Sequence, residues 1–242
     1  MKNAVIITGA SRGIGRATAK RFLSETNEFD SVVVIARPSE AFEATLRELH
    51  AIKSDKKVLQ IEADLSDLNE VDRIYTTLAA HKVNITGIVN NAGYTNPQML
   101  DDIAIDDFEK TLRTNLISPF RMVQLALRLG HGLKTVLNIA STAGMNGRAG
   151  WLTYSASKAA LINMSEVMSD ELDQYGINVI SISPGRCATD LRKTLAPDED
   201  PDTIMQPDHV AEIICLLFSP TGRMLESRNL VVRTKTQPVV SS

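Results

Sequence analysis

The stretch GWLTYSASK, residues 150–158, places a tyrosine and a lysine four residues apart. In a helix, side chains at this spacing lie one above the other on the same face, so the phenol of Tyr154 and the ammonium of Lys158 would be neighbours. A free phenol has a pKa of about 10, and a nearby cation lowers that pKa because it favours the phenolate. The pair is therefore suited to proton transfer. The spacing alone is common, and two ordinary surface residues explain it equally well.

The elements that would position this pair alternate between strands and helices. Short β-branched runs occur at 4–8, 31–36, 58–63, 85–91, 135–141 and 177–184. Unbroken apolar runs of this length suit parallel strands buried on both faces, and the segments between them carry apolar residues three and four apart. We expect a single domain, residues 1–242, with a Rossmann-type doubly wound parallel β-sheet flanked by helices on both faces. A final strand and a frayed tail are expected within 228–242.

Length and composition exclude several classes of function. The chain has 242 residues, of which 43% are hydrophobic and 23% charged, with a formal net charge of -3 and no basic patch that would indicate nucleic-acid binding. Cys187, Cys215 and the four histidines are scattered, so we expect no metal site and no disulfide framework. No apolar run approaches the ~20 residues of a membrane span or resembles a signal peptide, and we expect a cytoplasmic location.

The turn after the first strand reads TGASRGIG, residues 8–15, and leads into a predicted helix. Its three glycines permit a sharp turn and close approach of a ligand. The helix N-terminus offers free N–H groups and a positive dipole end to a pyrophosphate. We expect such a group at Gly9, Ser11, Arg12, Gly13, Ile14 and Gly15. A tight turn without a ligand is the alternative, because the spacing is G-x-x-x-G-x-G rather than the usual G-x-G-x-x-G.

The end of the second strand favours NADP over NAD. It reads Ile35, Ala36, Arg37, without the Asp or Glu that would accept a hydrogen bond from a free ribose 2′-OH. Arginine accommodates a 2′-phosphate instead, and we expect Arg12 to reach the same phosphate as Arg37. Two solvated surface arginines are the other interpretation.

Taken together, the motifs resemble those of the short-chain dehydrogenase/reductase family, in its compact single-domain branch. The resemblance covers almost the full chain. It is specific, because the motifs occur in the family's order. They are TGASRGIG at 8–15, Asp64-Leu65, NNAG at 90–93, Asn115 in TNLISPF, Ser141 in NIAS, YSASK at 154–158 and PGRCATD at 184–190.

The resemblance implies an NADP(H) cofactor and the residues that bind it. Asp64 and Leu65 would border the adenine, and the cofactor's middle would be lined by Asn91, Ala92 and Gly93. The nicotinamide end would be held by Pro184, Gly185 and Thr189. Asn90 also suits a strand-to-loop junction, where its amide bonds neighbouring backbone.

The resemblance also implies a reaction at C=O and CH–OH groups. A ketone that accepts hydride develops negative charge on its oxygen, so the site must supply a proton and a hydrogen-bond donor there. Tyr154 is the expected proton donor, and Lys158 is expected to bind the nicotinamide ribose. Ser141 would hold the substrate oxygen, and Asn115 would position a water that links Lys158 to solvent. Taken singly, Ser141 also fits a strand-end serine and Asn115 a helix-breaking amide.

These residues predict an NADPH-dependent reductase of ketones, aldehydes or diketones, reversible as an alcohol dehydrogenase. The expected small-molecule pocket is mostly apolar, and its residues are Tyr94, Thr95, Asn96, Met145, Asn146, Trp151, Arg186 and Cys187. Trp151 fits a core or subunit-contact aromatic equally well.

The segment 193–208 is the expected lid. Its stretch 195–208 holds three prolines and five acids, which favours neutral carbonyl compounds over anionic acyl carriers.

Other functions and two assemblies stay open. The 3-oxoacyl-[acyl-carrier-protein] reductases of this family share every motif above. A non-catalytic NADP-sensing regulator would bind the cofactor without turnover, although such proteins usually lose the tyrosine or the lysine. The residues after Thr221-Gly222 lack the glycines that are common there in the family. This leaves both a homodimer and a homotetramer open. The apolar face of the helix after Tyr154 argues against a monomer.

Overall fold

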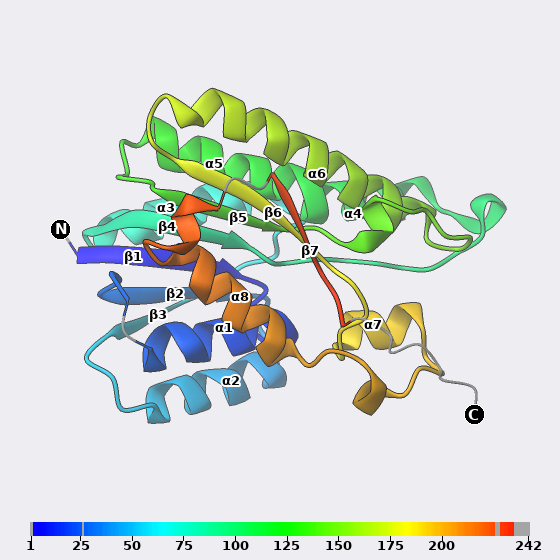
Figure 1. Cartoon of the computed structure of the whole chain (residues 1–242), viewed down its shortest axis with the longest axis horizontal. Helices are drawn as coiled ribbons and strands as arrows, with labels where there is room; N and C mark the ends of the chain where they lie inside the picture. The colour runs from blue at the N-terminus through cyan, green and yellow to red at the C-terminus, as the bar shows by residue number, and fades with distance from the viewer. Residues whose placement is uncertain (1, 26, 226–227, 235–242) are drawn as a thin grey trace.

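The computed structural model describes residues 2–25, 27–225 and 228–234 (Figure 1). The strands are β1 (Lys2–Thr8), β2 (Ser31–Ala36), β3 (Lys57–Glu62), β4 (Val83–Asn90), β5 (Thr135–Ile139), β6 (Asn178–Pro184) and β7 (Asn229–Val232). The helices are α1 (Gly13–Ser24), α2 (Glu40–Ala51), α3 (Leu68–Ala80), α4 (Ile105–Leu112), α5 (Ser118–Arg128), α6 (Leu152–Asp173), α7 (Asp190–Leu195) and α8 (Pro207–Phe218). A π-helical turn, Arg113–Ile117, joins α4 to α5.

All seven strands belong to one parallel sheet with the order β3-β2-β1-β4-β5-β6-β7. Parallel neighbours require crossover connections, and these place helices on both faces of the sheet. The chain proceeds from β1 toward β3 on one side and from β4 toward β7 on the other. A crevice therefore opens at the carboxyl ends of β1 and β4, where ligands of this fold bind. The predicted doubly wound Rossmann-type sheet is confirmed.

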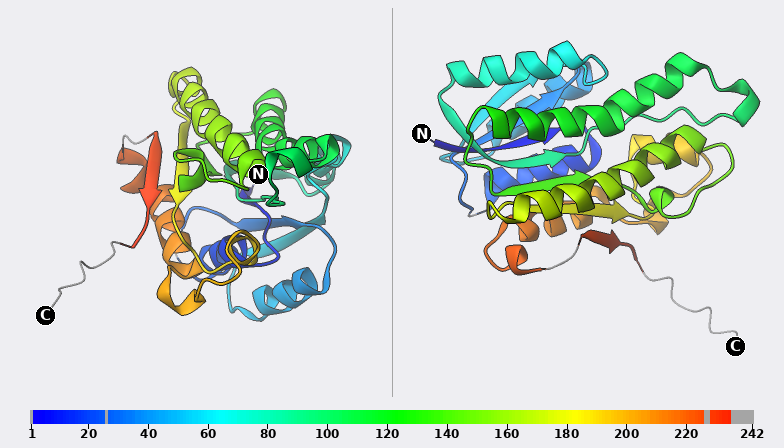
Figure 2. Two further views of the ribbon diagram at one scale, coloured as in Figure 1. Left: turned by 90° about the vertical axis from the view of Figure 1, so that its right-hand side faces the viewer. Right: turned by 90° about the horizontal axis from the view of Figure 1, so that it is seen from above.

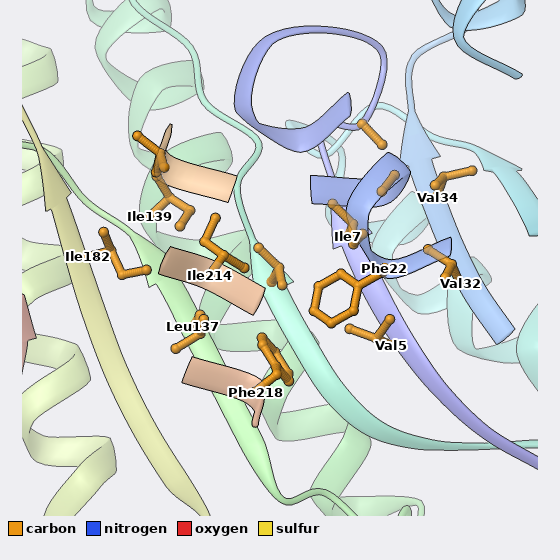
Figure 3. Packing of buried hydrophobic residues seen from close by; sticks show 14 of the residues in the cluster. Val5, Ile7, Phe22, Val32, Val34, Leu137, Ile139, Ile182, Ile214 and Phe218 are labelled. Atoms are coloured by element: carbon orange, nitrogen blue, oxygen red, sulfur yellow. The ribbon is translucent and has the colours of Figure 1, made fainter. Parts of the chain in front are cut away.

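Alternation along β1 divides the core into two layers. Val5 and Ile7 face one layer, whereas Ala4 and Ile6 face the other. The first layer lies under α1, α2 and α8, and Figure 3 shows its side chains, Val5, Phe22 and Phe218 among them. The rings of Phe22, Phe29 and Phe218 meet edge to face at 5.2–5.7 Å. The second lies under α3, α5 and α6. Figure 2 shows the two groups of helices on opposite sides of the sheet. Because both faces are covered, the sheet holds the strand ends rigidly.

The predicted strand positions agree with the structure to within about two residues at each end. β2 spans the predicted 31–36, whereas β1 and β4 each begin two residues before the predicted start. β7 confirms the final strand, and residues 235–242 of the expected tail lie outside the described residues. Within the described residues, no helix combines the length and the apolar character that crossing a membrane requires.

Candidate active site

A cavity of about 620 Å³ lies at the carboxyl ends of the strands and is lined by residues that follow β1 to β6. This edge faces away from the N-terminus, on the side where α7 lies (Figure 1). The sheet brings together residues that are far apart in sequence, because parallel strands end at one edge. The cavity is lined by every predicted cofactor-binding and catalytic residue except Gly15 and Asn115. These two residues lie behind the cavity wall and support it.

The glycine turn exposes backbone to the cavity at Gly9 and Gly13. Gly9 and Gly13 have φ angles of +65° and +57°, a left-handed backbone that favours glycine. A Cβ on Gly15 would lie 2.5 Å from Nδ2 of Asn91. The N-cap of α1 is Arg12, whose side chain makes no capping hydrogen bond, so the first N–H groups of the helix have no side-chain acceptor. This geometry fits a pyrophosphate held at a helix N-terminus.

Thr8 and Asn91 tie the glycine turn to the loop after β4. The Thr8 hydroxyl accepts hydrogen bonds from the backbone N–H groups of Asn91 and Ala92, both at 3.0 Å. The Asn91 amide donates to the carbonyl oxygens of Thr8 and Gly9 at 2.9 and 3.1 Å. Sequence analysis missed this role of Thr8, whose only signal is a hydroxyl directly before the first glycine.

Asn90 has the structural role that sequence analysis left open. It is buried and does not line the cavity. Its amide donates to Oδ1 of Asn138 at 2.8 Å, and the Asn138 amide donates to Ser165 at 2.9 Å. These bonds connect β4, β5 and α6 inside the fold.

The chain after β2 carries a guanidinium group that forms no salt bridge within the described ranges. This group belongs to Arg37, which lines the cavity. Burial raises the pKa of Asp64, but hydrogen bonds from Ser66 and the charge of Arg37 outweigh it and hold that pKa below its ordinary value. Arg12 differs, because its guanidinium donates to Asp190 of α7 at 2.6 Å. Arg37 is therefore the freer partner for a phosphate.

Tyr154 and Lys158 lie on the first turns of α6 and are only 5% and 3% exposed. Nζ of Lys158 lies 5.9 Å from the centre of the Tyr154 ring and donates to the carbonyl oxygen of Ile139 at 2.7 Å. Ser141 begins the 3-10 turn that follows β5. A Cβ on Gly144 in that turn would lie 2.6 Å from the carbonyl carbon of Lys158, so the turn packs directly on α6. The three predicted catalytic groups therefore share one wall of the cavity.

The pKa of Tyr154 differs from the sequence-based expectation. Burial raises the pKa of the phenol above its ordinary value and outweighs the opposing effects of a hydrogen bond with Ser141 and the charge of Arg192. The expectation of a net lowering of this pKa was wrong, because it left out the desolvation of the phenol. Burial also lowers the pKa of Lys158 to about 8. At neutral pH the phenol therefore keeps its proton and Lys158 stays mostly charged.

Asn115 lies in the π-helical turn and is fully buried. Its Oδ1 accepts from the N–H of Tyr94 at 2.8 Å, and its Nδ2 donates to the Tyr94 carbonyl and to Ser157, both at 2.9 Å. A Cβ on Gly93 would lie 3.8 Å from this Oδ1 and 3.9 Å from Nζ of Lys158. Asn115 thus fixes the loop after β4 against α6, beside Lys158. Single π-turns within helices often mark functional sites.

The substrate end of the cavity contains half of the residues expected there. Tyr94, Trp151, Arg186 and Cys187 line it, whereas Thr95, Asn96, Met145 and Asn146 do not. Sequence analysis missed Arg148, Leu191 and Arg192, which also line the cavity. The guanidinium carbons of Arg148 and Arg192 lie 5.0 and 5.6 Å from the Trp151 ring centre. The sequence could have indicated Arg192 as a cavity residue, because it lies three residues after the predicted cofactor-binding residue Thr189, about one helical turn into α7.

The segment 193–208, the expected lid, contributes only Leu195 to the cavity lining. α7 begins at Asp190, and its residues cover the substrate end. None of the acids in 195–208 lines the cavity, and Glu199 accepts hydrogen bonds from Arg192 at 2.5 and 2.8 Å. The expectation of neutral substrates rested on those acids, so the structure removes its basis.

A glycine-lined crevice at the carboxyl ends of parallel strands, with a buried tyrosine and lysine on the adjoining helix, is typical of Rossmann-type oxidoreductases. Residues 3–200 match the family model described as short chain dehydrogenase. The chain belongs to the short-chain dehydrogenase/reductase family and is an oxidoreductase of that family.

Curated and structural relatives agree with this assignment. The chain is 32% identical over 192 residues to a 3-oxoacyl-[acyl-carrier-protein] reductase of Synechocystis sp., with 78% of this chain and 76% of that protein covered. It is 31% identical over 235 residues to carbonyl reductase family member 4 of Danio rerio, with coverage of 93% and 96%.

Two solved structures are similar over nearly the whole chain. One is 4-hydroxyisoleucine dehydrogenase complexed with NADH, with 26% identity, a TM-score of 0.83 and coverage of 95% and 96%. The other is a short chain dehydrogenase from Burkholderia cenocepacia J2315 in complex with NADP, with 28% identity, a TM-score of 0.79 and coverage of 94% and 95%.

Proposed function

We propose that this protein is an NADPH-dependent carbonyl reductase, reversible as an alcohol dehydrogenase. The observation that carries the proposal is a single cavity lined both by the glycine turn and by Ser141, Tyr154 and Lys158. NADPH, when bound, supplies the hydride for the carbonyl carbon. Overall, the carbonyl compound, NADPH and one proton give the alcohol and NADP⁺.

The residues of this chain would control the proton. Tyr154, which burial keeps protonated, donates its hydroxyl proton to the carbonyl oxygen as negative charge develops there. Ser141 donates a hydrogen bond to the same oxygen. Lys158, still mostly charged at neutral pH, stabilises the tyrosinate that remains. Asn115 positions a water that returns a proton from solvent by way of Lys158.

NADPH is proposed over NADH because of Arg37. This guanidinium lines the cavity, no described residue pairs with it, and the strand end before it carries no acid. Of the two related structures above, one contains NADH and the other NADP, so family membership leaves the choice to the local residues. In this arrangement Asp64 and Leu65 border the adenine, and Pro184, Gly185 and Thr189 hold the nicotinamide end.

A second candidate is a 3-oxoacyl-[acyl-carrier-protein] reductase, which is the name of several curated relatives. A screen of NADPH oxidation distinguishes the two, using diketones, aldehydes, quinones, sugars and 3-oxoacyl thioesters at equal concentrations. Turnover of small carbonyl compounds supports the proposal. Thioester reduction far above all others would favour the second candidate. Tight NADPH binding with no turnover would indicate an NADP-sensing regulator instead.

We also propose that the protein is a homodimer or homotetramer that uses α5 and α6. Phe120 on α5 and Val167 on α6 are 41% and 49% exposed, and Ile117 beside α5 is 37% exposed. Ile117 and Phe120 also line a shallow apolar groove with Met164 of α6. Apolar side chains gathered on one face favour association with a second copy.

A further inference from the structure

The charges at the substrate end of the cavity favour an anion. Arg148, Arg186 and Arg192 line this end. Among the described residues, the carboxylates that line the cavity are Asp64 and Asp190, which are bonded to Ser66 and Arg12. Glu199, which does not line the cavity, forms ion pairs with both Arg192 and Arg186. Three guanidinium groups and this one carboxylate leave two positive charges uncompensated. A partly enclosed cleft lined by one sign of charge concentrates ligands of the opposite sign.

Arg192 is the most enclosed of these groups and is held in a fixed orientation. Its side chain and that of Glu199 are each only 15% exposed. Nε and Nη2 donate to the two oxygens of Glu199 at 2.5 and 2.8 Å, a bidentate pair. Nη1 makes no hydrogen bond to any residue in the described part of the chain. A guanidinium has a second edge, formed by Nη1 and Nη2, that matches a carboxylate. Glu199 thus orients Arg192 and leaves that edge free.

The position of Arg192 links it to the reacting groups. α7 carries Arg192 between Leu191 and Leu195, and both leucines pack in one hydrophobic cluster with Tyr154 and Trp151. The positive charge of Arg192 also favours the phenolate of Tyr154. Its guanidinium carbon lies 5.6 Å from the centre of the Trp151 ring, and Trp151 precedes the helix that carries Tyr154. A carboxylate bound to Arg192 would therefore lie close to a carbonyl group bound to Tyr154.

We propose that the substrate is an oxo acid whose carboxylate lies within a few bonds of the reacting carbonyl, and that Arg192 binds this carboxylate. The proposal rests on the carbonyl reductase function proposed above. Trp151 supplies an apolar wall for the carbon chain between the two groups. Arg148 and Arg186, at the cavity mouth, attract the anion before it reaches Arg192.

The test compares short 2-oxo and 3-oxo acids with their methyl esters, which keep the carbonyl but lose the charge. NADPH oxidation is measured with the wild-type protein, Arg192→Gln, Arg192→Lys and the control Arg128→Gln on the outer end of α5. In parallel, calorimetry follows oxo-acid binding to the NADP⁺-bound protein, in which no hydride is available.

We expect the wild-type protein to have a higher kcat/KM for the acids than for their esters. Arg192→Gln should lower kcat/KM for the acids and weaken their binding by about 10- to 100-fold, mainly through KM and with little change for the esters. Arg192→Lys should restore part of the loss, and Arg128→Gln should change nothing. Equal losses for acids and esters, or esters reduced better than acids by the wild-type protein, would overturn the assignment of Arg192 and leave the reductase proposal standing. No oxidation of NADPH with either series would overturn this inference, and the reductase proposal would fall with it only if the substrate screen above also gave no turnover.

Discussion

Replacement of Arg37 by serine tests how the protein recognises the cofactor's 2′-phosphate. In the structure Arg37 lines the cavity without a salt-bridge partner among the described residues, so its bond to the phosphate replaces no internal ion pair. A hydrogen bond to a charged group contributes about 1.5–3 kcal/mol. Because about 1.4 kcal/mol corresponds to a factor of ten, Arg37→Ser should weaken NADPH binding about 10- to 150-fold. NADH, which lacks the phosphate, should bind as before.

Arg12→Ser is the matched control, because Arg12 must leave Asp190 before it can bind the phosphate. Its effect on the Kd for NADPH should therefore be smaller than that of Arg37→Ser. The Kd values for NADPH and NADH are measured by calorimetry for both variants, and Arg37→Asp should narrow or reverse the preference. Equal affinities for NADPH and NADH in the unmutated protein would refute the reasoning.

Three further predictions follow from the site and its surroundings. The reduction rate should fall above about pH 8, by about tenfold per pH unit, because Lys158 has a pKa of about 8 and loses its charge there; a pH–rate profile that stays flat to pH 10 would contradict this. Gly15→Ala should lower the free energy of unfolding by about 1–3 kcal/mol, because its Cβ would overlap the carbonyl oxygen of Gly9. The control Gly147→Ala has open space around the added Cβ, so denaturant unfolding should show almost no change in its free energy of unfolding. Phe120→Glu should shift the protein toward monomers in analytical ultracentrifugation, and an unchanged sedimentation coefficient would place the subunit contact elsewhere.

The sheet could be predicted because its signal is local. Runs such as Val32–Ile35 are apolar throughout and fully buried in β2, and the 3.6-residue pattern of Phe42, Leu46 and Leu49 marks the buried face of α2. The clustering of the residues expected to bind the cofactor and to catalyse was also predictable, because each lies at a strand end or in a helix turn next to a recognisable motif. Strand order then places them at one edge of the sheet.

The substrate end was less predictable because its residues meet only in three dimensions. Arg192 and Glu199 pair across the end of α7, and this contact removes an acid that composition had assigned to the pocket. Arg148 lies three residues before Trp151, whose N–H donates to the Arg148 carbonyl oxygen at 3.0 Å. No sequence motif indicates that its guanidinium packs over the Trp151 ring. The raised pKa of Tyr154 depends on the burial of its phenol in the folded chain, which the spacing to Lys158 cannot reveal.

The central claim is that Tyr154 donates the proton in an NADPH-dependent reduction. Its most direct test is the turnover of Tyr154→Phe on the best carbonyl substrate, measured together with its Kd for NADPH. We expect turnover to fall by about 10²- to 10⁴-fold, because a general acid is lost, while NADPH binding stays largely intact. Turnover of the variant at a near-normal rate would contradict the claim.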